Sequence, residues 1–280
     1  MIKIRAMTTD DIPFAIRLTD TENWAFTRQD FLRLLKLSLG GCFVAVNEKK
    51  KAGLVTTTIY DSFAWIGNVI VIESARGHGI GAQLVNCAIS HIERKGIGKM
   101  GLYSYLRTRS LYMKFGFRET EYFARYAGIS TERNGKGAEP LTSRHLKRIA
   151  NFDKTRFGAQ RVRLLRLLIH DSPNLAFVSE DHGRVSGYII AKGGPSGYEI
   201  GPWVCDHDAD GLAGTLLNAE LCPMEGKRVE ITVPKRNGYT IHLLKKAGFS
   251  LAREVAEMFR GGVPKRKPEA IFAVGGLEKG

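Results

Sequence analysis

Six consecutive residues in the first half of the chain are suited to binding a phosphate group. Positions 76–81 read Arg-Gly-His-Gly-Ile-Gly and lie between an apolar run at 65–72 and a long amphipathic stretch at 79–95. This pattern predicts a strand, a glycine-rich turn and a helix. The first N–H groups of a helix lack partners within it and carry partial positive charge, and glycine lets such a backbone approach a ligand closely. The spacing therefore predicts a pyrophosphate-binding turn, to which Arg76 adds a cation and His78 a further donor.

Two common phosphate motifs do not fit this turn. A dinucleotide-binding Gly-x-Gly-x-x-Gly follows the first strand and precedes an acidic residue by about 20 positions, whereas this turn follows the fourth expected strand. The Gly-Lys-Ser/Thr ending of a P-loop is also absent from the turn. For the turn taken alone, the remaining alternative is a tight strand-to-helix connection that binds nothing.

A second short motif lies downstream of the turn. Residues 111–117 read Leu-Tyr-Met-Lys-Phe-Gly-Phe. The turn at 76–81 and this motif resemble the two signatures of the GNAT superfamily of N-acetyltransferases, Arg/Gln-x-x-Gly-x-Gly/Ala and Leu-Tyr-x-Lys-x-Gly-Phe. The resemblance covers residues 1 to about 128. It implies acetyl-CoA, or another acyl-CoA, as co-substrate, and transfer of the acyl group to a primary amine by direct attack in a ternary complex.

The resemblance also implies roles for individual residues. The backbone of the strand is expected to pair with the pantetheine arm and to position the thioester through Val69, Ile70 and Val71. The turn expected to hold the pyrophosphate consists of Arg76, Gly77, His78, Gly79, Ile80 and Gly81. Tyr112 is expected to protonate the departing thiolate. The family often has Asn seven residues before this tyrosine, where this chain has Tyr105, so some CoA contacts are expected to differ.

The general base is harder to assign from the sequence. Glu73, at the end of the expected strand, is the first candidate and would act through a water molecule. A turn or helix-capping carboxylate is the competing interpretation of Glu73, and Asp61 and Glu22 are weaker candidates. Large aromatic side chains could line the acceptor pocket, although such residues more often belong to the core. The four candidates are Trp24, Phe26, Trp65 and Trp203.

The elements around these motifs occur twice along the chain. At a constant offset of 132 residues, Gly79 falls on Gly211 and Lys114 falls on Lys246. Each copy shows the same order of expected strands and helices, as a duplicated domain requires. We therefore expect an α/β protein (α+β by some schemes) of two tandem GNAT-like domains, each a mixed, mostly antiparallel sheet flanked by helices. The expected domains are 1–134 and 135–280.

The second copy lacks residues that the chemistry requires. Residues 208–213, Asp-Ala-Asp-Gly-Leu-Ala, align with the turn, and Leu244 aligns with Tyr112. Aspartates repel phosphates and leucine has no proton to donate, so we expect the second half to lack a donor site and to be structural or to shape the acceptor pocket. Residues 206–211 also resemble the start of a calcium loop, but Leu217 replaces its final glutamate, and no metal site is expected.

Composition narrows the class of protein. Of 280 residues, 44% are hydrophobic and 25% charged, which is ordinary for a soluble globular protein. An apolar run of about 20 residues and a signal peptide are both absent from the sequence, which predicts a cytoplasmic protein with no membrane partner. The four scattered cysteines argue against a zinc site or a disulfide framework. The net charge of +14 fits an anionic cofactor, an acidic acceptor or nucleic acid.

The function predicted from these features is N-acetyl transfer to a small-molecule amine or a peptide, by a monomer or homodimer. One alternative is a tRNA- or nucleic-acid-binding, aminoacyltransferase-like protein on the same doubled fold, although a nucleic-acid partner is not expected. The other is a CoA-binding regulator without turnover. A basic cluster could meet an acidic acceptor or RNA, but a solvated helix face is its competing interpretation. Its members are Lys154, Arg156, Arg161, Arg163 and Arg166.

Overall fold

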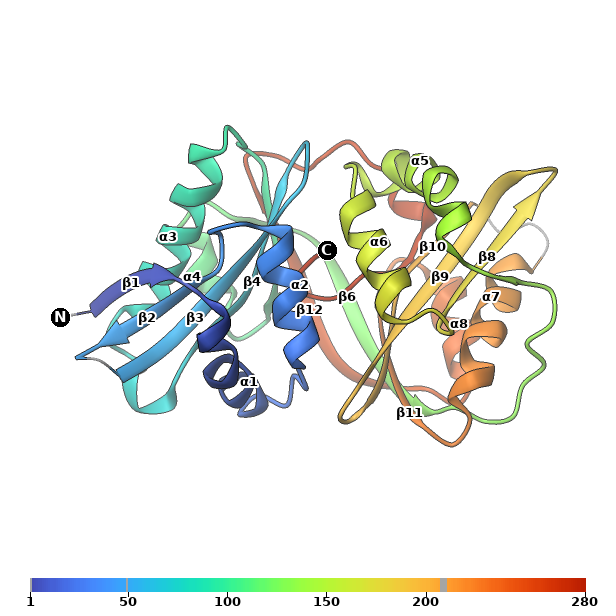
Figure 1. The fold of residues 1–280 in the computed structure, drawn as a ribbon, viewed down its shortest axis with the longest axis horizontal. Coiled ribbons are helices and arrows are strands. Elements are labelled where there is room, and N and C mark those ends of the chain that lie inside the picture. Colours follow the sequence, from blue (N-terminus) through green and yellow to red (C-terminus); the bar gives the residue numbers. More distant parts are fainter. Residues whose placement is uncertain (1, 49, 207–210) are drawn as a thin grey trace. The chain divides into compact units, whose positions relative to one another are not determined.

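The chain divides into two compact units in a computed structural model that describes residues 2–48, 50–206 and 211–280 (Figure 1). The N-terminal unit comprises residues 1–120, 257–263 and 277–280, and the C-terminal unit comprises residues 121–256 and 264–276. Two segments that come late in the sequence therefore belong to the N-terminal unit. The boundary expected between residues 134 and 135 separates the two copies of the repeated sequence, and it stays a prediction.

The N-terminal unit is built on a mixed sheet. In order across the sheet, its strands are β1 (Ile2–Ala6), β2 (Phe43–Asn47), β3 (Lys50–Ile59), β4 (Ala64–Val71), β5 (Met100–Tyr105) and the last residues of β12 (Ser250–Arg260). Strands β1 to β4 pair antiparallel, and β5 pairs parallel with β4. The parallel pair requires a crossover, which α3 provides.

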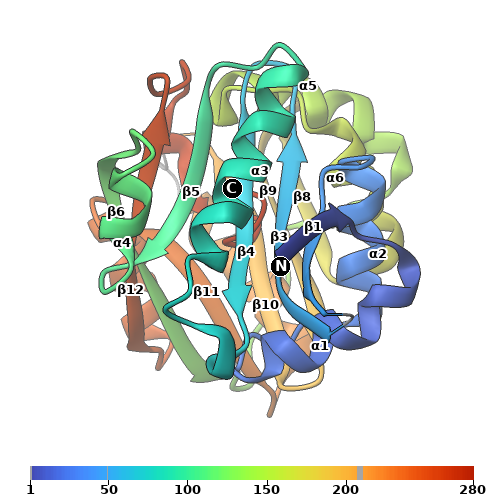
Figure 2. The ribbon, with the colours of Figure 1, turned by 90° about the vertical axis from the view of Figure 1, so that its left-hand side faces the viewer.

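Helices cover both faces of this sheet, and α3 lies in front of β4 in Figure 2. The helices are α1 (Ile12–Asp20), α2 (Arg28–Leu37), α3 (Ile80–Arg94) and α4 (Arg109–Met113). Leu54 and Ile70 join the apolar side chains of α1 and α2 in one core cluster. The neighbouring Gly53 faces α3, because a Cβ at this position would lie 3.2 Å from Leu84 Cδ1. Neighbouring residues point to opposite faces because a strand repeats every two residues.

Local sequence explains where two of these helices begin. At α2, Asp30 N donates to Thr27 Oγ1 at 3.2 Å and Thr27 N donates to Asp30 Oδ2 at 2.9 Å, a capping box. α3 begins after Gly79, whose φ of 75° lies in the left-handed region. Only glycine adopts this conformation without a steric cost from Cβ. The geometry of the turn therefore requires glycine at position 79, whatever the turn binds.

The C-terminal unit repeats the order of the N-terminal sheet. In order across it, the strands are β7 (Glu139–Pro140), β8 (Ala176–Asp181), β9 (Arg184–Gly194), β10 (Gly197–Cys205), β11 (Arg228–Pro234), most of β6 (Arg118–Ile129) and the first residues of β12. β13 (Ile271–Ala273) also pairs with β10. β10 and β11 pair parallel, and the other described pairs are antiparallel. Strands β7 to β11 thus repeat both the order and the directions of β1 to β5.

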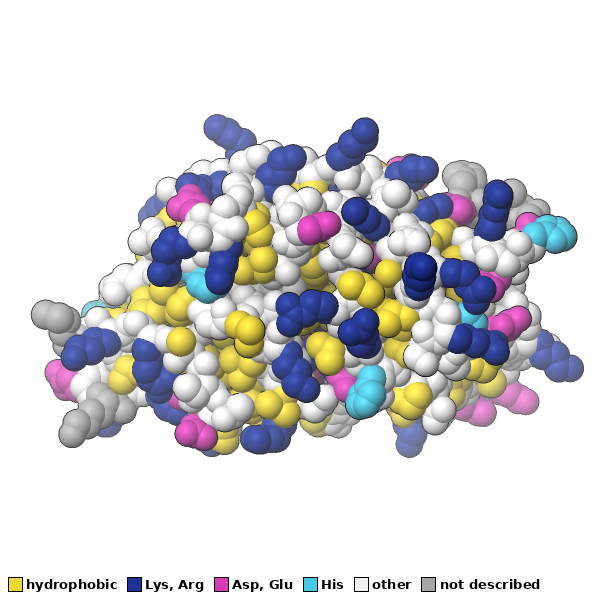
Figure 3. Space-filling model, turned by 45° about the horizontal axis from the view of Figure 1, so that its top comes forward, with side chains coloured by type: hydrophobic (Ala, Val, Ile, Leu, Met, Phe, Trp, Pro, Cys, Tyr) yellow, Lys and Arg dark blue, Asp and Glu magenta, His cyan; other side chains and the backbone are white. Residues whose placement is uncertain are grey.

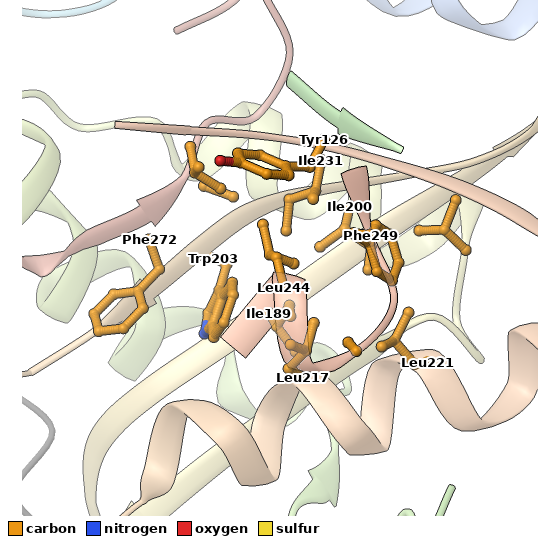
Figure 4. Packing of buried hydrophobic residues seen from close by; sticks show 14 of the residues in the cluster. Tyr126, Ile189, Ile200, Trp203, Leu217, Leu221, Ile231, Leu244, Phe249 and Phe272 are labelled. Carbon is orange, nitrogen blue, oxygen red and sulfur yellow. The ribbon is translucent and has the colours of Figure 1, made fainter. Parts of the chain in front are cut away.

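One apolar core holds the C-terminal unit together (Figure 4). The helices of this unit are α5 (Leu146–Phe157), α6 (Val162–Asp171), α7 (Leu212–Leu221) and α8 (Gly238–Lys246). Trp203 and Ile189 from the sheet meet Leu217 of α7, Leu244 of α8 and Phe249 in this cluster. Leu244, which aligns with Tyr112 of the first copy, is therefore a buried core residue.

Both units have a mixed, mostly antiparallel sheet with flanking helices, so the predicted fold class is confirmed. The sequence-based strand at 65–72 corresponds to β4 (Ala64–Val71), and the predicted helix at 79–95 corresponds to α3. In the described parts of the chain, no helix has the length and apolar character needed to span a bilayer.

Candidate active site

Strands β4 and β5 separate soon after they meet. Among the described residues, their pairing comprises only Ala64 with Met100 and Trp65 with Gly101. The edge of β4 that faces β5 therefore lacks a ladder partner in the described chain from Ile66 onward. Backbone groups must find partners when they are buried, so such an edge is suited to an extended ligand that pairs with it as a strand would.

A bulge interrupts β4 in the middle of this open edge. The register of β3 and β4 shifts by one residue between the pairs at Leu54 and Thr56, where β4 contains the extra residue. Asn68, on the bulged strand, has φ 50°, a left-handed conformation that asparagine tolerates better than most residues. Bulges redirect backbone groups next to active sites. The strand residues that the sequence predicts to contact the pantetheine arm lie directly after this bulge: Val69, Ile70 and Val71.

β4 leads into the glycine-rich turn through a short 3-10 helix (Glu73–Ala75). The first hydrogen bond at the start of α3 runs from Gln83 N to Gly79 O at 3.1 Å, so the N–H groups of residues 80–82 precede the helical ladder. A Cβ at Gly77 or Gly79 would meet no atom within 4 Å. Backbone donors beside open space, at the positive end of a helix, are suited to binding a pyrophosphate.

The Arg76 side chain is engaged within the protein. Its Nε donates to Val71 O at 3.0 Å, and its Nη2 donates to Glu22 Oε1 at 2.9 Å. The exposed His78 ring has Nδ1 3.0 Å from Arg76 O. The guanidinium thus ties the end of β4 to the turn after α1, and in this arrangement the backbone of the turn is left to contact a phosphate.

Tyr112 of α4 is buried, and its neighbour Leu111 lies near the start of α3. Its ring makes an edge contact with Phe117, with centroids 6.4 Å apart, and its neighbour Leu111 would lie 3.9 Å from a Cβ at Gly81. Burial raises the pKa of the Tyr112 phenol above its ordinary value of 10.0, because low-dielectric surroundings disfavour the phenolate. The hydroxyl is therefore protonated at neutral pH, which is the state that a proton donor requires.

The three candidate bases occupy different places. Glu73 is exposed and follows β4 directly. Both carboxylate oxygens of Glu22 accept hydrogen bonds, from Arg76 and, at 3.3 Å, from Arg107. Asp61 lies three residues before β4, and the first and last residues of this strand are roughly 23 Å apart at 3.3 Å per residue. Geometry therefore keeps Glu73 as the first candidate.

The four aromatic candidates have different surroundings. Trp24 Nε1 donates to Tyr105 OH at 2.6 Å, so the hydroxyl that replaces the family's asparagine is engaged within the protein. Phe26 belongs to the core cluster of α1 and α2, and Trp203 to the core of the C-terminal unit. Trp65 is buried and Nε1 donates to Leu277 O at 2.9 Å. Phe26 and Trp203 are therefore core residues.

Sequence reasoning missed residues 277–280, which pack against β4 within the N-terminal unit. Besides the bond from Trp65, Tyr60 OH donates to Lys279 O at 2.6 Å. Between these anchors, a Cβ at Gly67 would lie 2.5 Å from Glu278 Cα. A glycine inside a buried strand often marks the close approach of another backbone. Gly67 in the apolar run was therefore the one available signal.

The equivalent opening in the C-terminal unit is filled. Gly211 begins α7 with φ 75°, as Gly79 begins α3, and β10 stops pairing with β11 after Ile200. β13 then pairs with the last part of β10, and Val274 N donates to Thr232 O of β11 at 3.1 Å. The backbone groups that would bind an extended ligand are thus used within the protein.

The acidic turn of the second copy lies mostly outside the described residues, which exclude Asp208 and Asp210. Asp206 is described, and its Oδ1 accepts from Arg156 Nε at 2.8 Å. Among the residues that the structure describes, no group of His, Cys, Asp and Glu could hold a metal ion. Asp206 therefore has a partner within its own unit.

Arg161 does not lie on a solvated helix face with the rest of the basic cluster. It is buried, and Nε and Nη2 donate to the two carboxylate oxygens of Asp153 at 2.7 and 2.8 Å. Tyr188 OH also donates to Asp153 Oδ1, at 2.6 Å. A buried charge requires such pairing. Figure 3 shows Lys and Arg side chains spread over the visible face rather than gathered in one patch.

Comparison with known proteins matches both units to acetyltransferases. Residues 9–117 match the acetyltransferase (GNAT) family, and residues 149–273 match an acetyltransferase (GNAT) domain. Holothin acyltransferase of Pseudoalteromonas sp. (strain SANK 73390) is 26% identical over 263 residues, covering 92% of this chain and 88% of the relative. The two matched regions together span most of the chain, so the chain belongs to the GNAT family, with two GNAT domains in tandem, and is an acyltransferase.

Solved structures agree on the fold. A putative acetyltransferase from Pyrococcus horikoshii has a TM-score of 0.83 and 23% identity, and the match covers 100% of this chain and 96% of the other. A tandem GNAT protein from the clavulanic acid biosynthesis pathway has a TM-score of 0.65 and 14% identity, covering 94% and 99%. These likenesses extend along the whole chain, so the doubled arrangement occurs in other proteins.

Proposed function

We propose that the N-terminal unit transfers an acetyl group, or another acyl group, from acyl-CoA to a primary amine of a small molecule or peptide. One observation carries the proposal: the unpaired edge of β4 leads directly into the N-terminus of α3. A strand edge followed by a phosphate-binding turn suits a donor that has amide groups along an extended arm and a pyrophosphate at its end.

The residues of the N-terminal unit fit this donor. Val69, Ile70 and Val71 supply the strand edge beyond the bulge. The backbone N–H groups of residues 80–82 face the pyrophosphate, and the open space beside the glycines of the turn admits it. Acyl-CoA supplies the thioester, and the protein binds and orients it.

Proton transfer is proposed to involve Tyr112 and Glu73. Glu73 accepts the proton of the attacking amine through a water molecule, because only a neutral amine is nucleophilic. Backbone N–H groups of residues 69–71 stabilise the oxyanion that forms at the thioester carbonyl. Tyr112 donates its hydroxyl proton to the sulfur as the C–S bond breaks, and its raised pKa keeps this hydroxyl protonated beforehand.

The proposal is tested by calorimetry with acetyl-CoA and by thiol release with an amine panel. The panel contains n-butylamine, phenethylamine, lysinamide and spermidine. The donors are acetyl-, butyryl- and hexanoyl-CoA, because the Pseudoalteromonas relative is named an acyltransferase. We expect binding and amine-dependent release of thiol, and a wild-type protein that does not bind acyl-CoA would overturn the proposal.

Two results would favour the other functions instead. Acyl-CoA binding without thiol release or acylated product for any amine identifies a CoA-binding regulator. A tRNA gel shift with steep salt dependence, without amine acylation, identifies the nucleic-acid alternative, since each phosphate contact contributes to the salt slope.

A further inference from the structure

The turn formed by Leu277, Glu278 and Lys279 is buried in the N-terminal unit beside the open part of β4. Each of these residues has its own anchor on β3, β4 or the loop between them. Trp65 and Tyr60 bind the two carbonyl groups, and Glu278 lies against Gly67, where a side chain would exclude it. The strand pair thus fixes this turn residue by residue.

The position of the turn relative to the reaction centre follows from strand register. Gly67 is the last residue before the bulge, and residues 69–71, which we propose to hold the thioester, come directly after it. Thr56 pairs with Gly67, and Thr58 pairs with Trp65. Alternation along β3 places Thr56 and Thr58 on the same face as Leu54, so the turn covers the strand face next to the thioester position.

Three buried polar groups at this place have no hydrogen-bond partner in the described chain: Thr56 Oγ1, Thr58 Oγ1 and Asn68 Nδ2. Thr56 and Thr58 are fully buried, and Asn68 is 8% exposed. Proteins rarely leave such a group unsatisfied without a ligand or a functional reason, because its lost hydrogen bonds to water are not replaced. Thr56 and Thr58 lie on the strand face of Gly67, so we take a polar ligand on this face as the partner that completes them.

The turn also places a buried ion pair at this position. Glu278 is 4% exposed and Lys279 is 1% exposed, and Lys279 Nζ donates to Glu278 Oε1. The carboxylate is thus bound to a primary ammonium group, which is the functional group of the proposed acyl acceptor. Because a buried carboxylate requires a cation, removal of one ammonium favours its replacement by another.

We propose that Glu278 binds the ammonium group of the acyl acceptor as it arrives, and that Lys279 occupies this position until the acceptor displaces it. The bound ammonium then loses one proton through water to Glu73, the base proposed above, before its neutral nitrogen attacks the thioester. This inference rests on the proposed function. Thr56 and Thr58 then supply hydrogen bonds to polar groups near the amine of the acceptor. The substrate class is a primary amine with hydroxyl or amide groups close to the nitrogen, rather than a purely aliphatic amine.

Steady-state kinetics on the full chain test this inference, with n-butylamine and lysinamide as acceptors and acetyl-CoA as donor. Glu278→Gln keeps the side-chain volume and removes the charge, so we expect KM for lysinamide to rise about tenfold or more, with kcat and acetyl-CoA affinity changed less than about threefold. Lys279→Met removes the internal competitor, so KM for lysinamide should fall. Glu225→Gln, at an exposed position of the C-terminal unit, is the matched control.

The double variant Glu278→Gln/Lys279→Met guards against misfolding, because it removes both charges of the ion pair together. It should keep the high KM of the Glu278 variant and the acetyl-CoA affinity of the wild type. An unchanged KM in both Glu278 variants overturns this inference and leaves the proposed function intact. A wild-type protein that neither binds nor acylates any amine overturns both.

Discussion

Strands β4 and β10 occupy equivalent places in the two units, yet only β4 keeps an edge open. Both strands pair parallel with their neighbour for a few residues and then part from it, and both are followed by a helix that starts at a left-handed glycine. In the C-terminal unit the gap contains β13, whereas in the N-terminal unit no described strand enters it. The same strand framework and helix start therefore occur with an open gap in one unit and with a filled gap in the other.

The last ten residues of the chain contribute to both units, in two different ways. Residues 271–273 form β13 in the C-terminal unit, and residues 277–279 form the turn beside β4 in the N-terminal unit. The first closes a strand edge by backbone pairing. The second covers a strand face and leaves the β5-facing edge of β4 without a ladder partner in the described chain. We therefore expect substitutions at equivalent positions of the two units to differ in effect.

The largest difference is expected from tryptophan at the two glycines that start α3 and α7. Both have φ 75° and open space around the missing side chain, so Gly79→Trp and Gly211→Trp carry similar strain. Gly79→Trp should remove acetyl-CoA binding from the range measurable by calorimetry, because the indole fills the pyrophosphate position. Gly211→Trp should change the affinity less than about twofold. Equal losses in both variants would contradict the assignment of the donor site to one unit.

The next effect concerns the paired positions 112 and 244. Tyr112→Phe should lower kcat about 100-fold and leave acetyl-CoA affinity unchanged, because it removes a proton donor. Leu244→Tyr should leave kcat unchanged and cost about 1–3 kcal/mol of stability, because it overfills a core position. Thiol-release kinetics and urea unfolding measure the two outcomes.

The pH dependence of kcat gives a second test of Tyr112 as the proton donor. The raised pKa of Tyr112 keeps its hydroxyl protonated above the ordinary value of 10.0, so kcat should show no loss of the acid form up to about pH 9.5. A fall of kcat with an apparent pKa between 8 and 9 that disappears in Tyr112→Phe would contradict this (these pH values are rough, on the scale of ordinary phenol titration).

Stability against acid should differ at two equivalent caps. Thr8 N donates to Asp11 Oδ2 at 2.9 Å, and Thr142 N donates to His145 Nδ1 at 3.0 Å. The hydrogen bonds from Arg5 hold the pKa of Asp11 well below its usual 3.8, so its contribution is present above that pH and is lost as pH falls below it. Burial lowers the pKa of His145 from 6.5, so the unfolded state takes up protons first and stability falls as pH falls below 6.5.

Urea unfolding between pH 4 and about 7.5 checks this difference. His145→Gln should flatten the profile between about pH 6.5 and 5, and Asp11→Asn should cost about 1–2 kcal/mol at pH 7 and leave the His145 slope in place. A wild-type profile that is flat from pH 7 to 5 would exclude the role given to His145.

The smallest effect is expected at the exposed basic residues of α6. Arg166→Glu reverses a charge on a solvent-facing position of the C-terminal unit, so kcat, KM and acetyl-CoA affinity should each change less than about twofold. Salt titration of tRNA binding by gel shift measures the alternative role. Steeply salt-dependent binding that Arg166→Glu weakens would show a nucleic-acid surface.

Much of the fold was readable from the sequence because it depends on local periodicity. The apolar run of β4, the amphipathic pattern of α3 and the glycine at 79 each have a short-range physical cause, and the offset of 132 residues extended these predictions to the second copy. The parting of β4 and β5 could not be read, because it depends on pairing between residues about 35 positions apart. The positions of residues 277–279 and of β13 could not be predicted for the same reason. Gly67 was the one local signal that another backbone lies close to β4.

The site was predictable in part for a related reason. The residue types of the turn and of Tyr112 suggested their chemistry, but the sequence did not indicate that Arg76 binds Glu22 and Val71. Nor did it indicate that Glu278 and Lys279 are buried, since charged residues near a chain end are ordinarily exposed. Side-chain partners in tertiary structure decide these points.

The filled gap beside β10 bears on how this duplicated gene can evolve. Point substitutions in the acidic turn of the second copy, even ones that restored an arginine and a tyrosine, would not reopen a place for a second donor, because β13 supplies the partners of β10 and β11. Losing those hydrogen bonds would precede any gain of binding, so each early step is disfavoured. A donor site is therefore hard to build in the second copy by point substitutions alone.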